Sequence, residues 1–407
     1  MKKLRQDADA IVSASIQNVL PDEAVARALK DFERPKGKLI LVATGKAAWQ
    51  MTNAATKIIQ VDDGIVITKY GHVKADIPNT SCYEAGHPVP DQNSFLATQK
   101  ALDLVKDLTP DDCVLFLLSG GGSALFEKPL TPQEELLDIT KQLLACGADI
   151  VEMNTIRKRL SAVKGGRFAL SCRPAKVYSI VLSDIIGDPL DMIASGPAYP
   201  DASTCQQALS IVEKYNLKFT QQAMALLSKE TPKSLDNVTT MVTGSVKELC
   251  LAASNKCKEL GYEPILLTDR LCCEASQAGS FLGTILKSHE KDGKKLAFIA
   301  GGETVVHLKG KGKGGRNQEL ALAAAPHIVN MNAAFFSFGS DGTDGPTDAA
   351  GGYVDGNTVT LLKEKGLDVH EALANNDAYH ALQAADGLIM TGPTGTNVND
   401  VAVALLA

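Results

Sequence analysis

Short apolar runs alternate with amphipathic segments along most of the chain, and this alternation constrains the fold more than any other feature. Buried parallel strands form continuous apolar runs, whereas helices that cover a sheet carry one apolar face. The runs predict strands at residues 38–44, 64–68, 113–119, 176–183, 239–243, 263–268, 295–300 and 333–338. Helices are expected between them, for example over residues 91–106 and 131–146. The pattern therefore predicts an α/β fold with mainly parallel sheets flanked by helices.

The length of the chain predicts two domains, because 407 residues exceed what one hydrophobic core usually organises. The segment 228–236, SKETPKSLD, is polar, contains Pro232 and interrupts the pattern, so it is the candidate linker. We therefore expect a Rossmann-like α/β domain over residues 1–235 and a second α/β domain over residues 236–407.

Composition excludes several classes of protein. A hydrophobic fraction of 45% with 22% charged residues excludes a disordered chain, and a net charge of −6 argues against nucleic-acid binding. No signal peptide or long apolar segment is visible, so no membrane partner is expected. The nine cysteines form no C-x-x-C pair. Reduced thiols in a cytoplasmic protein fit this usage.

The most basic stretch runs from residue 301 to residue 320 and reads GGETVVHLKGKGKGGRNQEL. Lys309, Lys311, Lys313 and Arg316 stand among glycines at the start of a helical pattern. Glycine allows close approach of backbone N–H groups to an anion, and a helix N-terminus adds further donors. The stretch predicts a phosphate site that includes Glu303, Gly314, Gly315, Arg316 and Asn317. A Gly-rich hairpin with solvated lysines is the alternative.

Two further glycine turns follow predicted strands. Lys46, in ATGKAAWQM, stands where a strand passes into a helix. The run Ser119, Gly120, Gly121, Gly122 and Ser123 follows the apolar CVLFLL and suits a small anion. KGGR occurs twice, and its first copy supplies Lys164 as another candidate ligand-binding residue. The alternatives are a solvated lysine for Lys46, a tight turn without a ligand for the run 119–123, and a chance repeat for KGGR.

Aspartates gather after two other strands. Asp184, Asp188 and Asp191 follow one, and Asp341, Asp344 and Asp348 follow another. Glycine and proline prevent a regular helix there, so loops are expected. Carboxylates without nearby His or Cys favour Mg²⁺ over zinc. His87, in AGHPVPD, is interpreted as a structural residue.

These features together indicate phosphoryl transfer from a nucleoside triphosphate to a small acidic acceptor. No G-x-S-x-G elbow is present, which disfavours a serine hydrolase. No correctly placed G-x-G-x-x-G is present either, which disfavours a nicotinamide enzyme.

The chain resembles the class II glycerate kinases, a family of glycerate 2-kinases with its own type of C-terminal leucine-rich domain. The resemblance spans about residues 38–401 and is carried by the strings GKAAWQM, GHPVPD, LSGGGSAL, IRKRLSAVKGGRFA, SDIIGDPLDMIASGP, GGETVVHLKGKGKGGRNQELAL, SDGTDGPTDAAGG and TGPTGTNVND. It implies ATP- and Mg²⁺-dependent phosphorylation of D-glycerate, usually to 2-phosphoglycerate, in a cleft between two α/β domains. The functional lysine and arginine of the family match Lys46 and Arg316. Lys313 and Ala198 stand where arginine and threonine are common in the family.

From this resemblance we expect Lys46 and Arg316 to be catalytic. Kinase chemistry calls for an aspartate as general base, and we expect Asp184 in this role because it lies at a strand end beside a short glycine turn. We expect Asp341 and Asp344 to hold Mg²⁺. The alternatives are an NAD(P)H-dependent hydroxypyruvate reductase and a non-catalytic regulator that binds nucleotide or a small acid. The expected partners are ATP and D-glycerate, and a homodimer is compatible with the sequence.

Overall fold

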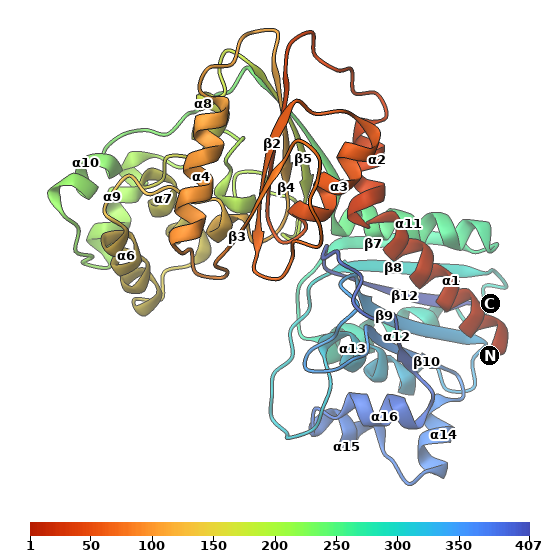
Figure 1. Cartoon of the computed structure of the whole chain (residues 1–407). Coiled ribbons are helices and arrows are strands. Elements are labelled where there is room, and N and C mark those ends of the chain that lie inside the picture. Colours follow the sequence, from red (N-terminus) through yellow and green to blue (C-terminus); the bar gives the residue numbers. More distant parts are fainter. The chain divides into compact units, whose positions relative to one another are not determined.

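The computed structural model describes all 407 residues. The chain forms two compact units (Figure 1). The N-terminal unit comprises Val25–Ser183 and Asp188–Thr243, and the C-terminal unit comprises Met1–Ala24, Asp184–Gly187 and Gly244–Ala407. The chain therefore passes between the units several times.

The N-terminal unit is built on a six-stranded sheet in the order β3-β2-β1-β4-β5-β6. Parallel pairing joins β3, β2, β1, β4 and β5, as the apolar runs predicted. The central strands β1 and β4 are buried along their whole length, which explains why they read as unbroken apolar runs. The strands are β1 (Leu39–Thr44), β2 (Asp63–Lys69), β3 (Ser81–Ala85), β4 (Cys113–Leu118), β5 (Lys176–Leu182) and β6 (Val238–Gly244).

The helices of the N-terminal unit cover this sheet and also form a separate cluster. In that cluster α6, α7, α9 and α10 bury apolar side chains such as Leu143, Ile156 and Leu227 against one another. The helices are α2 (Pro21–Leu29), which begins in the other unit, α3 (Ala48–Ile58), α4 (Gln92–Val105), α5 (Gly122–Leu125), α6 (Gln133–Ala145), α7 (Ile150–Arg159), α8 (Arg167–Ser171), η1 (Ile193–Ser195), α9 (Cys205–Lys214) and α10 (Gln221–Leu227).

The sheet of the C-terminal unit is mixed, and here the prediction of mainly parallel sheets is wrong. Its order is β11-β10-β9-β12-β8-β7, and only β7 and β8 pair in parallel. The apolar run at the C-terminus forms β12, which lies between β8 and β9 and is antiparallel to both. The strands would all have been parallel only if a helical crossover joined each strand to the next. The strands are β7 (Glu263–Leu271), β8 (Leu296–Gly302), β9 (Ala333–Gly339), β10 (Gly351–Asp355), β11 (Leu388–Ile389) and β12 (Asp400–Leu406).

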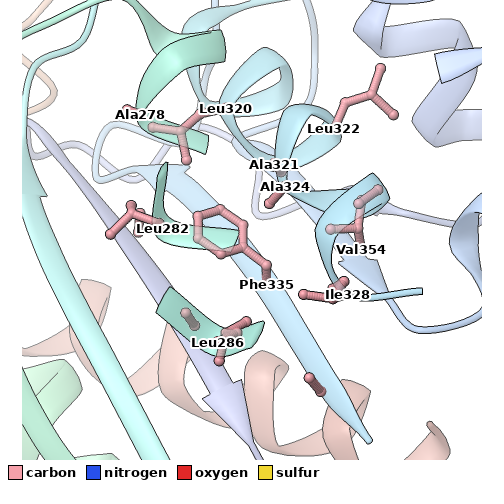
Figure 2. Close-up of a cluster of buried hydrophobic side chains, with 14 of the residues drawn as sticks. Ala278, Leu282, Leu286, Leu320, Ala321, Leu322, Ala324, Ile328, Phe335 and Val354 are labelled. Atoms are coloured by element: carbon pink, nitrogen blue, oxygen red, sulfur yellow. The ribbon is translucent and has the colours of Figure 1, made fainter. Parts of the chain in front are cut away.

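Helices cover both faces of this second sheet. Figure 2 shows Leu282 and Leu286 of α12 and Ala321 of α13 around Phe335 of β9. On the opposite face, α1 and α11 pack on β9 and β12 in a second buried cluster. The helices are α1 (Lys2–Asn18), α11 (Val246–Glu259), α12 (Ala275–His289), α13 (Arg316–Ala324), η2 (Ala325–His327), α14 (Thr358–Glu364), α15 (Val369–Ala374) and α16 (Ala378–Ala384).

The units differ from the predicted ranges 1–235 and 236–407 in two respects. Helix α1 covers the sheet of the C-terminal unit, although it opens the chain. The segment 228–236 is not a linker between the units, because it lies within the N-terminal unit and precedes that unit's sixth strand. Thr231 in this segment is buried and donates a hydrogen bond to Asp201.

All nine cysteines are free thiols, in agreement with the sequence prediction. No helix in the chain is both long enough and apolar enough to span a bilayer.

Candidate functional site

In the N-terminal unit, the pairing of β1 with β4 brings two predicted glycine turns together. Thr44 and Leu118, near the ends of these strands, are opposite each other. Beyond them, the Lys46 N–H donates to the Gly120 carbonyl at 2.9 Å, and the Ala47 N–H donates to Ser119 Oγ at 3.1 Å. Lys46 and the run 119–123, which we call the anion loop after the site that the sequence predicts there, therefore share the carboxyl edge of one sheet.

His87 belongs to this group, which its sequence context did not reveal. Gly121 has φ of 88°, and a Cβ there would lie 3.1 Å from the His87 ring and 3.2 Å from Lys46 Cγ. Burial, followed by the charge of Lys46, lowers the pKa of His87. The imidazole is therefore favoured in its neutral form beside the Lys46 ammonium group.

The Lys164 side chain packs behind the anion loop and bonds its backbone. Its side chain is fully buried, and its amine donates to the Ser123 carbonyl at 2.9 Å and the Phe126 carbonyl at 3.0 Å. It also forms an ion pair with buried Glu127 at 3.3 Å. These partners enclose the amine, so the structure places Lys164 behind the loop and not at its surface.

The C-terminal unit places Arg316 at the first position of α13, close to the ends of β8 and β9. Asp400, the first residue of β12, is opposite Gly302 of β8 and Gly339 of β9. Arg316 donates to both carboxylate oxygens of Asp400, at 2.5 Å from Nε and 3.1 Å from Nη2. Its Nη1 donates to Glu303 at 2.9 Å. The guanidinium is thus oriented by two carboxylates and retains N–H groups that a ligand can use.

Electrostatics favour a fixed, charged arginine. Burial alone would lower the pKa of Arg316, but Asp400 and then Glu303 raise it above its ordinary value. Burial raises the pKa of Asp400, and the charge of Arg316 opposes that rise. The Arg316 side chain remains 34% exposed, whereas that of Asp400 is only 9% exposed. The pair therefore presents a guanidinium to solvent over a buried carboxylate.

Asp344 caps the start of α13. Its carboxylate accepts the N–H groups of Asn317 at 3.1 Å and Gln318 at 2.9 Å. Burial raises the pKa of Asp344 to about 7. A Cβ at residue 315 would lie 2.2 Å from the Asp344 carboxyl carbon, so Gly315 is needed for this approach. Asn317 is also buried, and its side chain contacts Asp344 and Ser337.

The glycine-rich loop before α13 is neither a hairpin nor an open cradle of N–H groups. Residues 303–315 form an irregular loop that packs against the junction of α15 and α16. Asn376 Oδ1 accepts two of the loop's N–H groups and Asn375 two more. Asp377 accepts the N–H of Lys313, whose amine lies over the Tyr379 ring. The N–H groups of residues 309–313 are therefore used within the chain.

The remaining predicted aspartates are Asp341 and Asp184. Asp341 accepts the Thr343 N–H at 3.0 Å in the loop after β9. Asp184 belongs to the C-terminal unit, and its carbonyl accepts from Asn399, the residue before Asp400. No group of three or more His, Cys, Asp or Glu side chains is arranged to hold a metal ion.

Asp400 is the main residue that sequence reasoning missed. It ends the string TGPTGTNVND and precedes an apolar run, which is a signal for a polar residue at the edge of a sheet. That run was not recognised as a strand. The partner of Arg316 therefore remained hidden.

Comparisons with known proteins cover almost the whole chain. The model of a domain of unknown function (DUF4147) matches residues 7–228, and that of the MOFRL family matches residues 296–400. The chain is 49% identical to the D-glycerate 2-kinase of Thermotoga maritima over 100% of this chain and 99% of the relative. It is 41% identical to the glycerate 2-kinase of Pyrococcus horikoshii over 93% of this chain and 89% of the relative. A crystal structure of the Thermotoga maritima glycerate kinase matches with a TM-score of 0.94, 48% identity and 100% coverage of both chains.

Proposed function

Because the chain belongs to the glycerate 2-kinase family, we propose that it transfers a phosphoryl group from ATP to the 2-hydroxyl of D-glycerate. The observation that carries the proposal is the 49% identity over the full length to a D-glycerate 2-kinase. The two groups of residues described above suit this reaction, because phosphoryl transfer needs positioned cations more than covalent chemistry.

Arg316 is proposed to stabilise negative charge on the transferred phosphoryl group. It is oriented by Asp400 and Glu303 and keeps N–H groups for oxygen atoms of a ligand. Replacement Arg316→Ala should lower kcat by roughly 10³-fold or more, because arginines in this role contribute about that much. Near wild-type turnover in the folded variant would dismiss this role.

Lys46 and the anion loop are proposed to bind the triphosphate or the carboxylate of glycerate. The exposed lysine and the three consecutive glycines meet at one sheet edge. Lys46→Ala should raise the KM of at least one substrate. If both KM values and kcat stay unchanged, Lys46 has neither role. Lys164 acts indirectly in this proposal, by holding Ser123 and Phe126 in place.

Mg²⁺ is proposed to accompany ATP. Mg²⁺ in kinases is often held by one or two carboxylates together with phosphate oxygens and water. Asp341 fits this mode, because its carboxylate is only partly engaged. Asp344 fits less well, because both of its oxygens accept N–H groups from α13. Bound Mg²⁺ would neutralise phosphate charge.

Asp184 is proposed as the general base that accepts the hydroxyl proton of glycerate. It is the second residue after β5, and the Asn399 side chain donates a hydrogen bond to its carbonyl. If this role is correct, Asp184→Asn should lower kcat strongly and change the KM values little. The predicted position of substrate in a cleft between domains stays a prediction.

The function is tested by incubating the protein with Mg-ATP and D-glycerate and identifying the product by phosphorus NMR. We expect ADP and 2-phosphoglycerate. A second assay with hydroxypyruvate and NAD(P)H should show no change in nicotinamide absorbance. Nicotinamide oxidation without ADP formation would favour the reductase instead.

A further inference from the structure

A cavity of about 560 Å³ lies within the N-terminal unit, apart from the residues assigned above. It is bordered by α7, α9 and the turn before η1. Its volume is in the range of about 300 to 1,000 Å³ that is usual for small-molecule sites. Its lining includes Val151, Lys158, Asp191, Met192, Ser210 and Ile211.

The floor of the cavity is a buried ionic group. The Lys158 side chain is 3% exposed, and its amine lies 3.2 Å from Asp191 and 3.1 Å from Asp201. Asp191 is 29% exposed and uses one carboxylate oxygen for this contact. Its other oxygen remains available as an acceptor, which suits a hydroxyl group of a ligand.

The walls of the cavity are electrically balanced. Glu152 and Asp191 contribute two carboxylates, and Lys158 and Lys214 contribute two ammonium groups. Each of these charges already has a partner of opposite sign in the chain. A phosphate group would find no excess of positive charge here. An uncharged ligand with hydroxyl groups and a flat apolar body would fit better, between Met192, Val151 and Ile211.

A short chain of contacts connects the cavity wall to the anion loop. Met192 Sδ accepts a contact from Asn154 Nδ2 at 3.8 Å. Asn154 Oδ1 accepts a hydrogen bond from Ser195 Oγ at 2.9 Å, and Ser195 Oγ lies 3.1 Å from Ser123 Oγ. Two side chains therefore separate a wall residue from the loop proposed to bind an anion.

We propose that this cavity binds the nucleoside portion of ATP, with the triphosphate directed to the anion loop. The inference rests on the proposed kinase function and deepens it. Asp191 accepts a ribose hydroxyl, as carboxylates do in other nucleotide sites. The base lies against Met192 and Ile211, and the amide side chains of Gln206 and Gln207 border the same space.

The test fills the cavity from an exposed position. Ser210 lines the cavity, is exposed on α9, and its hydroxyl bonds only the Gln206 carbonyl within its own helix. Ser210→Trp should raise the KM for ATP, and the Kd for adenosine measured by calorimetry, by about tenfold or more. The kcat at saturating ATP and the KM for D-glycerate should stay within about twofold.

Glu213→Trp is the matched control, because Glu213 is exposed on the same helix but does not line the cavity. It should bind adenosine like the wild type. Unchanged adenosine binding by Ser210→Trp, or no adenosine binding by the wild type, would overturn the inference. The two proposals separate if the wild type binds adenosine and Ser210→Trp abolishes that binding, although the wild type does not phosphorylate D-glycerate. In that case the kinase proposal fails and the cavity assignment stands.

Discussion

The Arg316 side chain is held in one geometry by two carboxylates of the chain itself. A free arginine loses much conformational freedom when it is fixed in one geometry. The two hydrogen bonds that Arg316 donates to Asp400 and the one that it donates to Glu303 already impose that geometry. In the proposed reaction Asp400 acts through the arginine, as a positioning residue.

Replacement Asp400→Asn should remove the charge that orients Arg316. We expect kcat to fall by about 10- to 100-fold, as is usual when an outer partner of a functional group is lost. Steady-state kinetics on the folded variant measure this. Glu303→Gln is the comparison, because Glu303 makes one bond and is 46% exposed, and it should have a smaller effect. Equal kcat values for Asp400→Asn and the wild type would show that Arg316 needs no such support.

The stability of the protein should depend on pH through the buried side chain of Lys164. Burial lowers the pKa of Lys164 to about 8, although Glu127 partly opposes this effect. The unfolded chain titrates this lysine near 10.5, so between pH 8 and 10.5 the unfolded state binds the extra proton. The contribution of Lys164 to the free energy of unfolding therefore rises with pH across this window.

Denaturant unfolding of the wild type and of Lys164→Met at pH 8 and pH 10 measures this rise. The free energy of unfolding of the wild type minus that of Lys164→Met should rise by on the order of 1 to 3 kcal/mol from pH 8 to pH 10. Exposed Lys36→Met provides the baseline, since it should show no such change. A constant difference across the window would mean that Lys164 is not desolvated in the folded protein.

At the scale of elements, the glycine-rich loop and the α15–α16 junction form one structural unit. Asn376 has φ of 53°, and its side chain accepts two loop N–H groups and donates to Glu319 of α13. The loop is therefore fixed by side chains more than 60 residues away in sequence. Its glycines allow close packing against that junction, in particular at Gly310 and Gly312.

Asn376→Gly should loosen this loop without backbone strain, because glycine adopts positive φ readily. We expect a loss of about 1 to 3 kcal/mol in stability from the unpaired N–H and carboxylate groups. Hydrogen exchange of the Lys309 and Gly310 amides should accelerate, and mass spectrometry can follow it. Asn375→Ala is the control, since its side chain bonds only the Lys311 N–H at an exposed position. Unchanged exchange in Asn376→Gly would show that other contacts hold the loop.

The sequence predicted elements better than it predicted their partners. All eight expected strands exist. Six of them are largely buried, as continuous apolar runs predict, whereas β6 and β7 are partly exposed. β3, β10, β11 and β12 were not predicted, and three of these four belong to the mixed sheet. Strand direction depends on contacts between distant segments, such as β12 with β8, which local periodicity does not encode. The same limit hid Asp400, whereas glycine turns and family strings were enough to propose Lys46 and Arg316 as site residues.

At the scale of the whole molecule, the two units are not consecutive in sequence. Helix α1 contributes Leu4, Ile11 and Val12 to the buried face of the C-terminal sheet, and Tyr262 donates to Asp7 at 2.9 Å. An amphipathic stripe predicts that a helix covers a sheet but does not say which sheet. The predicted boundary at residue 235 assumed that sequence order equals spatial order. In this chain the first helix completes the second unit.

This arrangement predicts which unit a destabilising substitution in helix α1 will loosen. Ile11 is fully buried against the C-terminal sheet, so Ile11→Ala should cost roughly 2 to 4 kcal/mol through lost burial and a residual cavity. Hydrogen exchange should increase in Val246–Glu259 and in the strands of the C-terminal unit, more than 230 residues away in sequence. The N-terminal unit should keep its protection. Val114→Ala, in fully buried β4, should give the reverse pattern. If Ile11→Ala instead loosened β1 and β4, helix α1 would belong to the unit that follows it in sequence.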